Sequence, residues 1–165
     1  MKFYIKQRVL TLRDRFSIYD EGGREKYYVE GELLSFGKKL HLYEMNGYES
    51  AYLKQKVISF LPKYIISRDG ADIGEVVKAV TFLRQKYIVN GLGWVVSGDF
   101  LAHEYEITDS GKRVAAISKK WLSFGDSYEI DIDDREDAVN VLSVVLIIDA
   151  IMDTGATSSA SSSGR

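Results

Sequence analysis

The amino-acid sequence predicts a mainly β fold, a closed antiparallel barrel of about twelve short strands that encloses one apolar C-terminal helix. Three observations predict it. Turn signals recur along the chain before Asp133, apolar and polar side chains alternate between them, and one strongly apolar segment follows. The chain has 165 residues, which suits one domain with a sizeable core.

The turn signals are short and polar, and most separate runs rich in β-branched and aromatic residues. Asx-Gly pairs supply the positive φ angle that tight hairpins need. The signals are Asp20-Glu21-Gly22-Gly23, Asn46-Gly47, Asp69-Gly70, Asn90-Gly91, Ser97-Gly98, Asp109-Ser110-Gly111 and Gly125-Asp126. The presence of eleven tyrosines and a single proline also suits a sheet-rich chain.

Apolar and polar side chains alternate in several of the runs between these turns. In one run, Tyr128, Ile130 and Ile132 are separated by acidic residues, and residues 27–33, 39–42 and 104–107 repeat the same period of two. This period places successive side chains on opposite faces of a strand. Each run is therefore predicted to be a strand with one buried face.

The segment from Arg135 to Met152 departs from this alternation and predicts a helix. Asp133 and Asp134 are suited to cap its start, and apolar residues then surround the helix axis. A helix that is apolar all round must be buried on all sides, and no second strong helical segment is available to cover it. Only a curled or closed sheet encloses a helix about 10 Å across, which requires more than about eight strands.

We expect one barrel domain over residues 1–153 and a disordered, serine-rich tail over residues 154–165. The absence of cysteine excludes disulfides, thiol catalysis and thiolate metal sites. The formal net charge of −2 gives no reason to expect nucleic-acid binding. No signal peptide is recognisable, and the apolar stretch 138–152 is too short to span a bilayer, so a soluble, cytoplasmic protein is expected.

Several short motifs stand out by their order along the chain. They are Lys2-Phe3-Tyr4-Ile5-Lys6-Gln7, Ile18-Tyr19-Asp20-Glu21-Gly22-Gly23, Tyr28-Val29-Glu30-Gly31, Lys119-Lys120-Trp121, Asp126-Ser127-Tyr128-Glu129-Ile130 and Ile147-Ile148-Asp149. Together they resemble the LURP-one-related family, whose fold is similar to the tubby C-terminal domain and the phospholipid scramblases. The resemblance implies a twelve-stranded barrel threaded by a C-terminal helix. It implies no settled activity, because tubby domains bind phosphoinositides through basic surface residues whereas scramblases are linked to calcium and lipid movement.

Catalytic motifs are absent from the sequence. Neither Gly-x-Ser-x-Gly nor His-Glu-x-x-His occurs, and there is no phosphate-binding loop. His41 and His103 both fall in predicted strands; His41 is interpreted as a surface residue, and Glu104 is expected to raise the pKa of its neighbour His103. We therefore expect no enzyme, no catalytic residue and no cofactor, and a hydrolase with an unrecognised site is the weakest alternative.

The basic N-terminal segment is the candidate lipid-binding site. Its cations, interleaved with apolar residues, are Lys2, Lys6, Arg8, Arg13 and Arg15. A lysine or arginine close to an anionic membrane contributes about 1 kcal/mol of attraction. In the alternative interpretation, the segment packs on the barrel and its charges pair with the acidic run described next.

This acidic run lies immediately before the predicted helix and is a weak candidate for a calcium site. Its potential ligands are Asp126, Glu129, Asp131 and Asp133, and carboxylates are the hard oxygen ligands that calcium prefers. The resemblance to scramblases implies a calcium-binding segment at a similar place. The run lacks the glycine and closing glutamate of an EF-hand loop, so we expect a solvated strand face and no metal.

Asp149 is a carboxylate inside the apolar helix. An unpaired buried carboxylate is costly, and the negative end of the helix dipole adds to the cost. We expect a lysine or arginine that projects inward from a strand to pair with Asp149, or else exposure to water at the last turn. The functional alternative is a site at the mouth of the barrel.

These patterns predict a non-enzymatic binding or scaffold module that recognises an anionic phospholipid headgroup or a protein partner. The competing prediction is a calcium-responsive lipid-handling protein of the scramblase type. Neither a nucleic-acid partner nor a transmembrane segment is expected.

Overall fold

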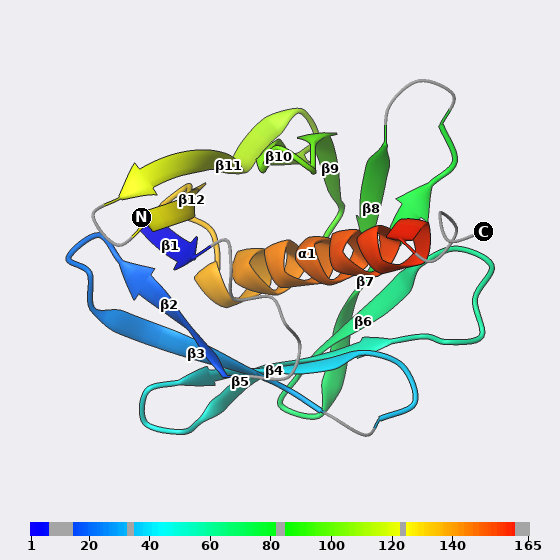
Figure 1. Cartoon of the computed structure of the whole chain (residues 1–165), viewed down its shortest axis with the longest axis horizontal. Helices are drawn as coiled ribbons and strands as arrows, with labels where there is room; N and C mark the ends of the chain where they lie inside the picture. The colour runs from blue at the N-terminus through cyan, green and yellow to red at the C-terminus, as the bar shows by residue number, and fades with distance from the viewer. Residues whose placement is uncertain (7–14, 33–34, 82–84, 123–124, 161–165) are drawn as a thin grey trace.

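Twelve strands follow one another along the chain and precede a single helix in the computed structural model (Figure 1). The structure describes residues 1–6, 15–32, 35–81, 85–122 and 125–160, without the side chains of residues 121–126 and 154–160. The elements are β1 (Lys2–Lys6), β2 (Phe16–Asp20), β3 (Glu25–Gly31), β4 (Lys39–Glu44), β5 (Glu49–Gln55), β6 (Lys63–Arg68), β7 (Ala71–Ala79), β8 (Lys86–Asn90), β9 (Trp94–Asp99), β10 (Glu104–Asp109), β11 (Lys112–Leu122), β12 (Gly125–Ile132) and α1 (Ala138–Ala160).

The strands form a closed antiparallel barrel, which confirms the predicted fold class. Each strand pairs with the next along the chain, and β1 pairs with β12 to close the sheet, with Tyr4 opposite Glu129. Because consecutive strands are antiparallel, their connections alternate between the two ends of the barrel. We call the end with the connections β1–β2, β3–β4, β5–β6, β7–β8, β9–β10 and β11–β12 the loop rim, and the opposite end the turn rim.

The predicted alternation is confirmed in β4 and β10; in β12 Glu129 is buried as well, and in β3 only Val29 is buried, while Leu33 lies outside the described residues. In β12, Tyr128, Ile130 and Ile132 are buried against the helix, and the inward positions of β4 and β10 are buried in the same way. Two predicted turn signals, Ser97-Gly98 and Gly125-Asp126, lie inside β9 and β12 instead. At Gly98 the reason is a close approach of two strands, since a Cβ atom would lie 2.5 Å from a backbone oxygen of β10.

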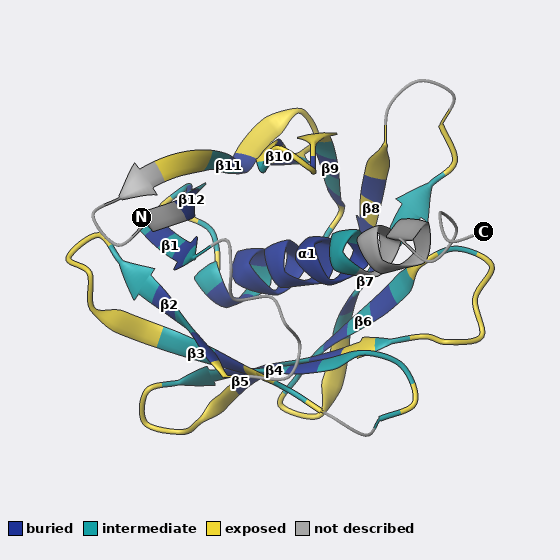
Figure 2. Cartoon of the chain, in the orientation of Figure 1, coloured by how far each residue is buried: buried dark blue, intermediate teal, exposed yellow. Residues whose placement is uncertain are grey.

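The helix α1 fills the barrel, as its uniformly apolar sequence predicts. All side chains from Val141 to Ile148 are fully buried, and Figure 2 shows most of the described helix as buried. The only polar member of this stretch, Ser143, donates a hydrogen bond of 2.7 Å to the backbone oxygen of Val139. The helix therefore adds no unsatisfied polar group to the core at that position.

The start of the helix differs from the predicted one. The cap is Asp137, whose carboxylate accepts a 3.1 Å hydrogen bond from the backbone N–H of Asn140. Asp133, predicted as a cap together with Asp134, instead accepts a bond from the backbone N–H of Arg135 in the turn before the helix. Several acidic residues precede the helix, and any of them could cap it. The residue that does so is Asp137, because it directly precedes the first residue of α1.

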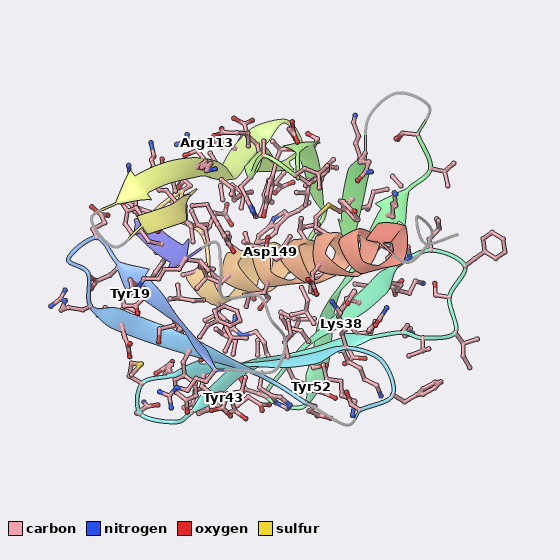
Figure 3. The ribbon with its side chains drawn as sticks, in the orientation of Figure 1. Tyr19, Lys38, Tyr43, Tyr52, Arg113 and Asp149 are labelled. Carbon is pink, nitrogen blue, oxygen red and sulfur yellow. The ribbon has the colours of Figure 1, made fainter. Side chains whose placement is uncertain are left out.

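The end of the helix also differs from the predicted boundary at Asp153. The helix α1 continues to Ala160, because each residue added to an existing helix gains a hydrogen bond without a new nucleus. Residues 161–165 lie outside the described residues, and the disordered tail predicted for residues 154–165 stays a prediction there. Lys38 Nζ reaches α1 from the β3–β4 connection and donates to Ala150 O at 3.0 Å and to Asp153 Oδ2 at 2.8 Å (Figure 3).

Replacing Leu142 by alanine should test the helix as the filling of the barrel. Leu142 is fully buried, and a Leu-to-Ala change at such a site leaves a cavity that costs about 2–5 kcal/mol. We expect the urea-unfolding free energy of Leu142→Ala to fall by that amount. Ile58→Ala, at a nearly fully exposed site, serves as the control and should unfold like the parent. Equal stability of all three proteins would contradict a tightly packed interior.

Candidate functional site

The connections of the two rims carry opposite charge. Among the described residues, the loop-rim connections contain three Lys and Arg residues (Arg15, Lys38 and Lys56) and one acidic residue (Glu32), whereas the turn-rim connections contain two basic and six acidic residues. The described loop-rim positions are residues 15, 32, 35–38, 56–62, 80–81, 85 and 100–103; the turn-rim ones are 21–24, 45–48, 69–70, 91–93, 110–111 and 133–137. One end of the barrel is therefore basic and the other acidic, although the whole chain is close to neutral.

Exposed lysines at the ends of strands extend the basic character of the loop rim. Lys54, Lys56 and Lys86 are exposed and Lys78 is half-buried, and within the described part of the chain none of the four forms an ion pair. Lys54 stands directly opposite Lys39 on the neighbouring strand. Like charges at opposed positions repel, but the ammonium group of Lys39 is paired with Glu32 Oε2 at 2.8 Å, so the charge of Lys54 is the one left without an ion pair among the described residues.

Large apolar side chains also protrude from the loop rim. These apolar tips, each at least four-fifths exposed, are Phe36, Ile58, Phe60, Val80 and Leu101. They come from four successive loop-rim connections. Sequence reasoning missed them, although one signal was present: the β5–β6 connection is apolar in a place where loops are usually polar.

Hydrogen bonds hold three of these connections side by side. The backbone N–H of Gln55 donates to Lys38 O at 2.8 Å, which joins the β3–β4 and β5–β6 connections. The N–H of Lys78, beside the β7–β8 connection, donates to Pro62 O at 3.5 Å. Figure 1 shows the β5–β6 connection beside the C-terminal end of α1. The basic and apolar groups of these three connections thus lie on the same side of the loop rim.

The predicted lipid-binding residues divide between two environments. Lys2 Nζ lies 3.2 Å from Glu129 Oε1, and the hydroxyl of Tyr4 donates to Glu129 Oε2 at 2.8 Å. Burial raises the pKa of Glu129, but the bonds from Tyr4 and Lys2 outweigh burial and lower this pKa overall. For Lys2, the alternative interpretation therefore holds: its charge is paired with the acidic run.

Lys6 and Arg15 stand at the loop rim, because Lys6 ends β1 and Arg15 directly precedes β2. The guanidinium of Arg15 lies 3.6 Å from the ring centre of Tyr28, a cation–π contact that leaves its charge exposed. Arg8 and Arg13 lie outside the described residues. Lipid binding by these residues stays a prediction.

The weak calcium candidates face cations rather than one another. In addition to the pairing of Glu129, Asp131 Oδ2 lies 3.6 Å from Arg113 and Asp133 Oδ1 lies 2.9 Å from Arg135. Hydrogen bonds from Arg135 lower the pKa of Asp133 to about 2. The side chain of Asp126 lies outside the described residues, and no three potential metal ligands converge in the described part of the chain.

Asp149 is buried inside the barrel, but its hydrogen-bond partner differs from the prediction. Tyr128 Oη on β12 hydrogen bonds with Asp149 Oδ2, and no lysine or arginine among the described residues pairs with this carboxylate. Figure 3 shows Asp149 on α1 within the barrel. Burial raises the pKa of Asp149 to about 7, against the lowering effect of the bond from Tyr128. A neutral or nearly neutral carboxyl group needs no cationic partner, which explains the difference.

His103 belongs to the same buried cluster, in the β9–β10 connection rather than in a strand, and its φ is +53°. Its ring is stacked on Tyr128 at 4.6 Å, and its Nδ1 lies 3.7 Å from Asp149 Oδ1, too far for a hydrogen bond. Burial and then the charge of Lys119 lower the pKa of His103. The expected rise through Glu104 is therefore wrong, because Glu104 is directed elsewhere and accepts a bond from Lys119 N.

The stability of the protein should report the titration of Asp149. Between its ordinary value near 3.8 and its raised value of about 7, the folded protein holds a proton that the unfolded chain has released. The contribution of Asp149 to stability is thus fully present below about pH 3.8 and is lost as the pH rises through 7. Asp149→Asn lacks this loss, so we expect its stability relative to wild type to rise from pH 4 to 7 and to level off above.

Urea unfolding of both proteins across this pH range checks the prediction. The lowered pKa of His103 gives a slope of opposite sign below pH 6.5 in both proteins, so the part of the difference above pH 6.5 reports the titration of Asp149. Tyr128→Phe removes the bond that lowers the pKa of Asp149, so it should move the slope to higher pH. A difference between Asp149→Asn and wild type that is constant with pH would contradict a carboxyl group that titrates near neutrality.

Comparisons with known proteins agree on the fold. A sequence model of the LURP-one-related family matches residues 1–149. An uncharacterised Bacillus subtilis protein, YxjI, is 35% identical over 152 residues, which cover 92% of this chain and 94% of that one. The X-ray structure of an Arabidopsis thaliana protein superposes with a TM-score of 0.67 at 16% identity, over 91% of this chain and 90% of the other. In the described residues, no helix has the length and hydropathy needed to cross a bilayer.

Proposed function

This chain belongs to the LURP-one-related family, and we propose that it is a non-enzymatic binding module that docks its loop rim on an anionic phospholipid surface. The observation that carries the proposal is the opposite charge of the two rims. An anionic surface attracts the loop rim and repels the turn rim, so the charges favour both binding and one orientation.

The free lysines of the loop rim support this assignment. Lys54, Lys56 and Lys86 are exposed, and their charges are not neutralised by an ion pair within the described part of the chain. Arg15, whose guanidinium is exposed, stands at the same rim and adds to the attraction.

A binding role fits the remaining polar groups better than catalysis. The carboxylates Glu129, Asp131 and Asp133 are engaged by cations, so they are poorly placed to receive calcium in a scramblase-like mechanism. The side chains of the buried cluster, Tyr128 and Asp149, have almost no contact with solvent, and a substrate does not reach them without opening the barrel.

Neutralising the loop-rim lysines should weaken vesicle binding. We expect Lys54→Gln, Lys56→Gln and Lys86→Gln, combined in one protein, to bind phosphatidylserine-containing vesicles roughly a hundredfold less tightly, because each charge contributes about 1 kcal/mol near the membrane. Flotation with vesicles at increasing salt concentration measures the effect, and the triple variant should also show a shallower dependence on salt.

The matched control removes three cations from the turn side of the barrel, in Lys26→Gln, Lys112→Gln and Arg135→Gln. It has the same change in net charge and should bind like wild type. Neutral phosphatidylcholine vesicles and soluble inositol phosphates separate a surface from a free phosphate ligand. The absence of wild-type binding to anionic vesicles at any ionic strength would reject the proposed function, and equal weakening by both triple variants would reject the loop rim as the site.

A further inference from the structure

We infer that the loop rim does more than rest on the headgroups: its apolar tips enter the boundary between headgroups and acyl chains. This inference rests on the proposed function and specifies how the same surface meets the bilayer. The tips are Phe36, Ile58, Phe60, Val80 and Leu101, as defined above.

The exposure of the tips is the first argument. Ile58 and Phe60 have relative exposures of 98% and 107%, so within the described part of the chain they contribute almost nothing to the folded core. They are not isolated exceptions, because the neighbouring connections add Phe36 and Val80. A cluster of exposed large apolar groups on one surface marks an interaction site.

The lysines around the tips indicate a membrane rather than a folded protein partner. Lys56 directly precedes the apolar part of the β5–β6 connection, and Lys54, Lys78 and Lys86 end or begin the flanking strands. Lysine is depleted in protein–protein interfaces, where its ammonium group would have to lose water. At a bilayer the same side chain lays its methylenes along apolar groups and extends its charge to the phosphates.

The arrangement of the tips also favours a membrane over a folded protein partner. They project from separate connections of a closed barrel, three of which are tied together by backbone bonds at Gln55 and Lys78. Separate protrusions suit a fluid boundary that adapts to each of them, to a depth of about 5–10 Å. By contrast, the exposed apolar groups of the β4–β5 turn, Met45 and Tyr48, are only about half exposed and lie among acidic residues.

The test replaces the two most exposed tips, in Ile58→Ser with Phe60→Ser. Each buried side chain of this size is worth about tenfold or more in affinity, so we expect the double variant to bind phosphatidylserine vesicles at least tenfold more weakly. Its remaining binding should disappear at high salt, whereas wild type should keep a salt-resistant fraction. Met45→Ser with Tyr48→Ser is the matched control on the turn rim and should bind like wild type.

A second measurement locates a tip directly. In Phe60→Trp, the indole replaces a fully exposed ring, and its fluorescence should be quenched by lipids brominated near the top of the acyl chain beyond the quenching of the wild-type tryptophans. Because the tips make so little contact with the core, Phe60→Trp and the Ile58→Ser, Phe60→Ser double variant should melt like wild type. No extra quenching in Phe60→Trp would overturn the inference.

The outcomes separate this inference from the proposed function. If the lysine variant loses vesicle binding but the tip variant does not, the loop rim binds headgroups without insertion, and only the inference fails. If wild type does not bind anionic vesicles, both fail. If the tip variant binds vesicles like wild type but loses a protein partner that wild type captures, the tips form a protein interface and the inference is again overturned.

Discussion

The burial of α1 is the constraint on which the rest of the structure depends. The helix presents apolar side chains in every direction from Val141 to Ile148, and a single flat layer covers only one side of a helix. A sheet that closes on itself covers all sides at once. The pairing of β1 with β12 completes this closure. Burial of the helix on all sides therefore requires the first and last strands of the chain to pair with each other.

Closure also decides where the protein meets other molecules. A closed sheet has no free edge for strand pairing, and its inner face is occupied by the helix. The connections at the two ends remain, and the sequential antiparallel order assigns them alternately to the two rims. The tight glycine turns therefore collect at one end and the longer connections at the other, where basic and apolar groups share one surface.

The direction of the helix matches the charges of the rims. Its positive N-terminal end lies at the acidic turn rim, where Arg68 Nη1 donates to Asp137 and Asn140 at 2.8 Å. In the C-terminal half of the helix, the backbone oxygen of Ala150 accepts a hydrogen bond from Lys38 of the basic loop rim. The positive end of the helix dipole thus faces the carboxylate of Asp137, and both rims contribute a cationic side chain that ties the helix to the barrel.

Local patterns in the sequence determined the strands, the apolar helix and the need for a closed barrel, because period-two alternation and an all-round apolar helix follow from neighbours in the chain. They also indicated that Asp149 needs a partner. Only the tertiary structure decided which partner that is, and it brought His103 and Tyr128 to the same place. Burial raises the pKa of Asp149, so a neutral carboxyl group costs less free energy in the core than a buried ion pair, and the identity of the side chain alone does not show this.

The same division holds for the surface. The sequence identified the basic N-terminal segment, but only the closed barrel pairs Lys2 with Glu129, 127 residues further along the chain. The loop rim was not predicted either, since its lysines and apolar tips are scattered from Phe36 to Leu101 over several strand ends and connections, of which only the β5–β6 connection is unusually apolar. Sequence patterns report what neighbours in the chain do, whereas a surface is assembled from residues that only the closure of the sheet brings together.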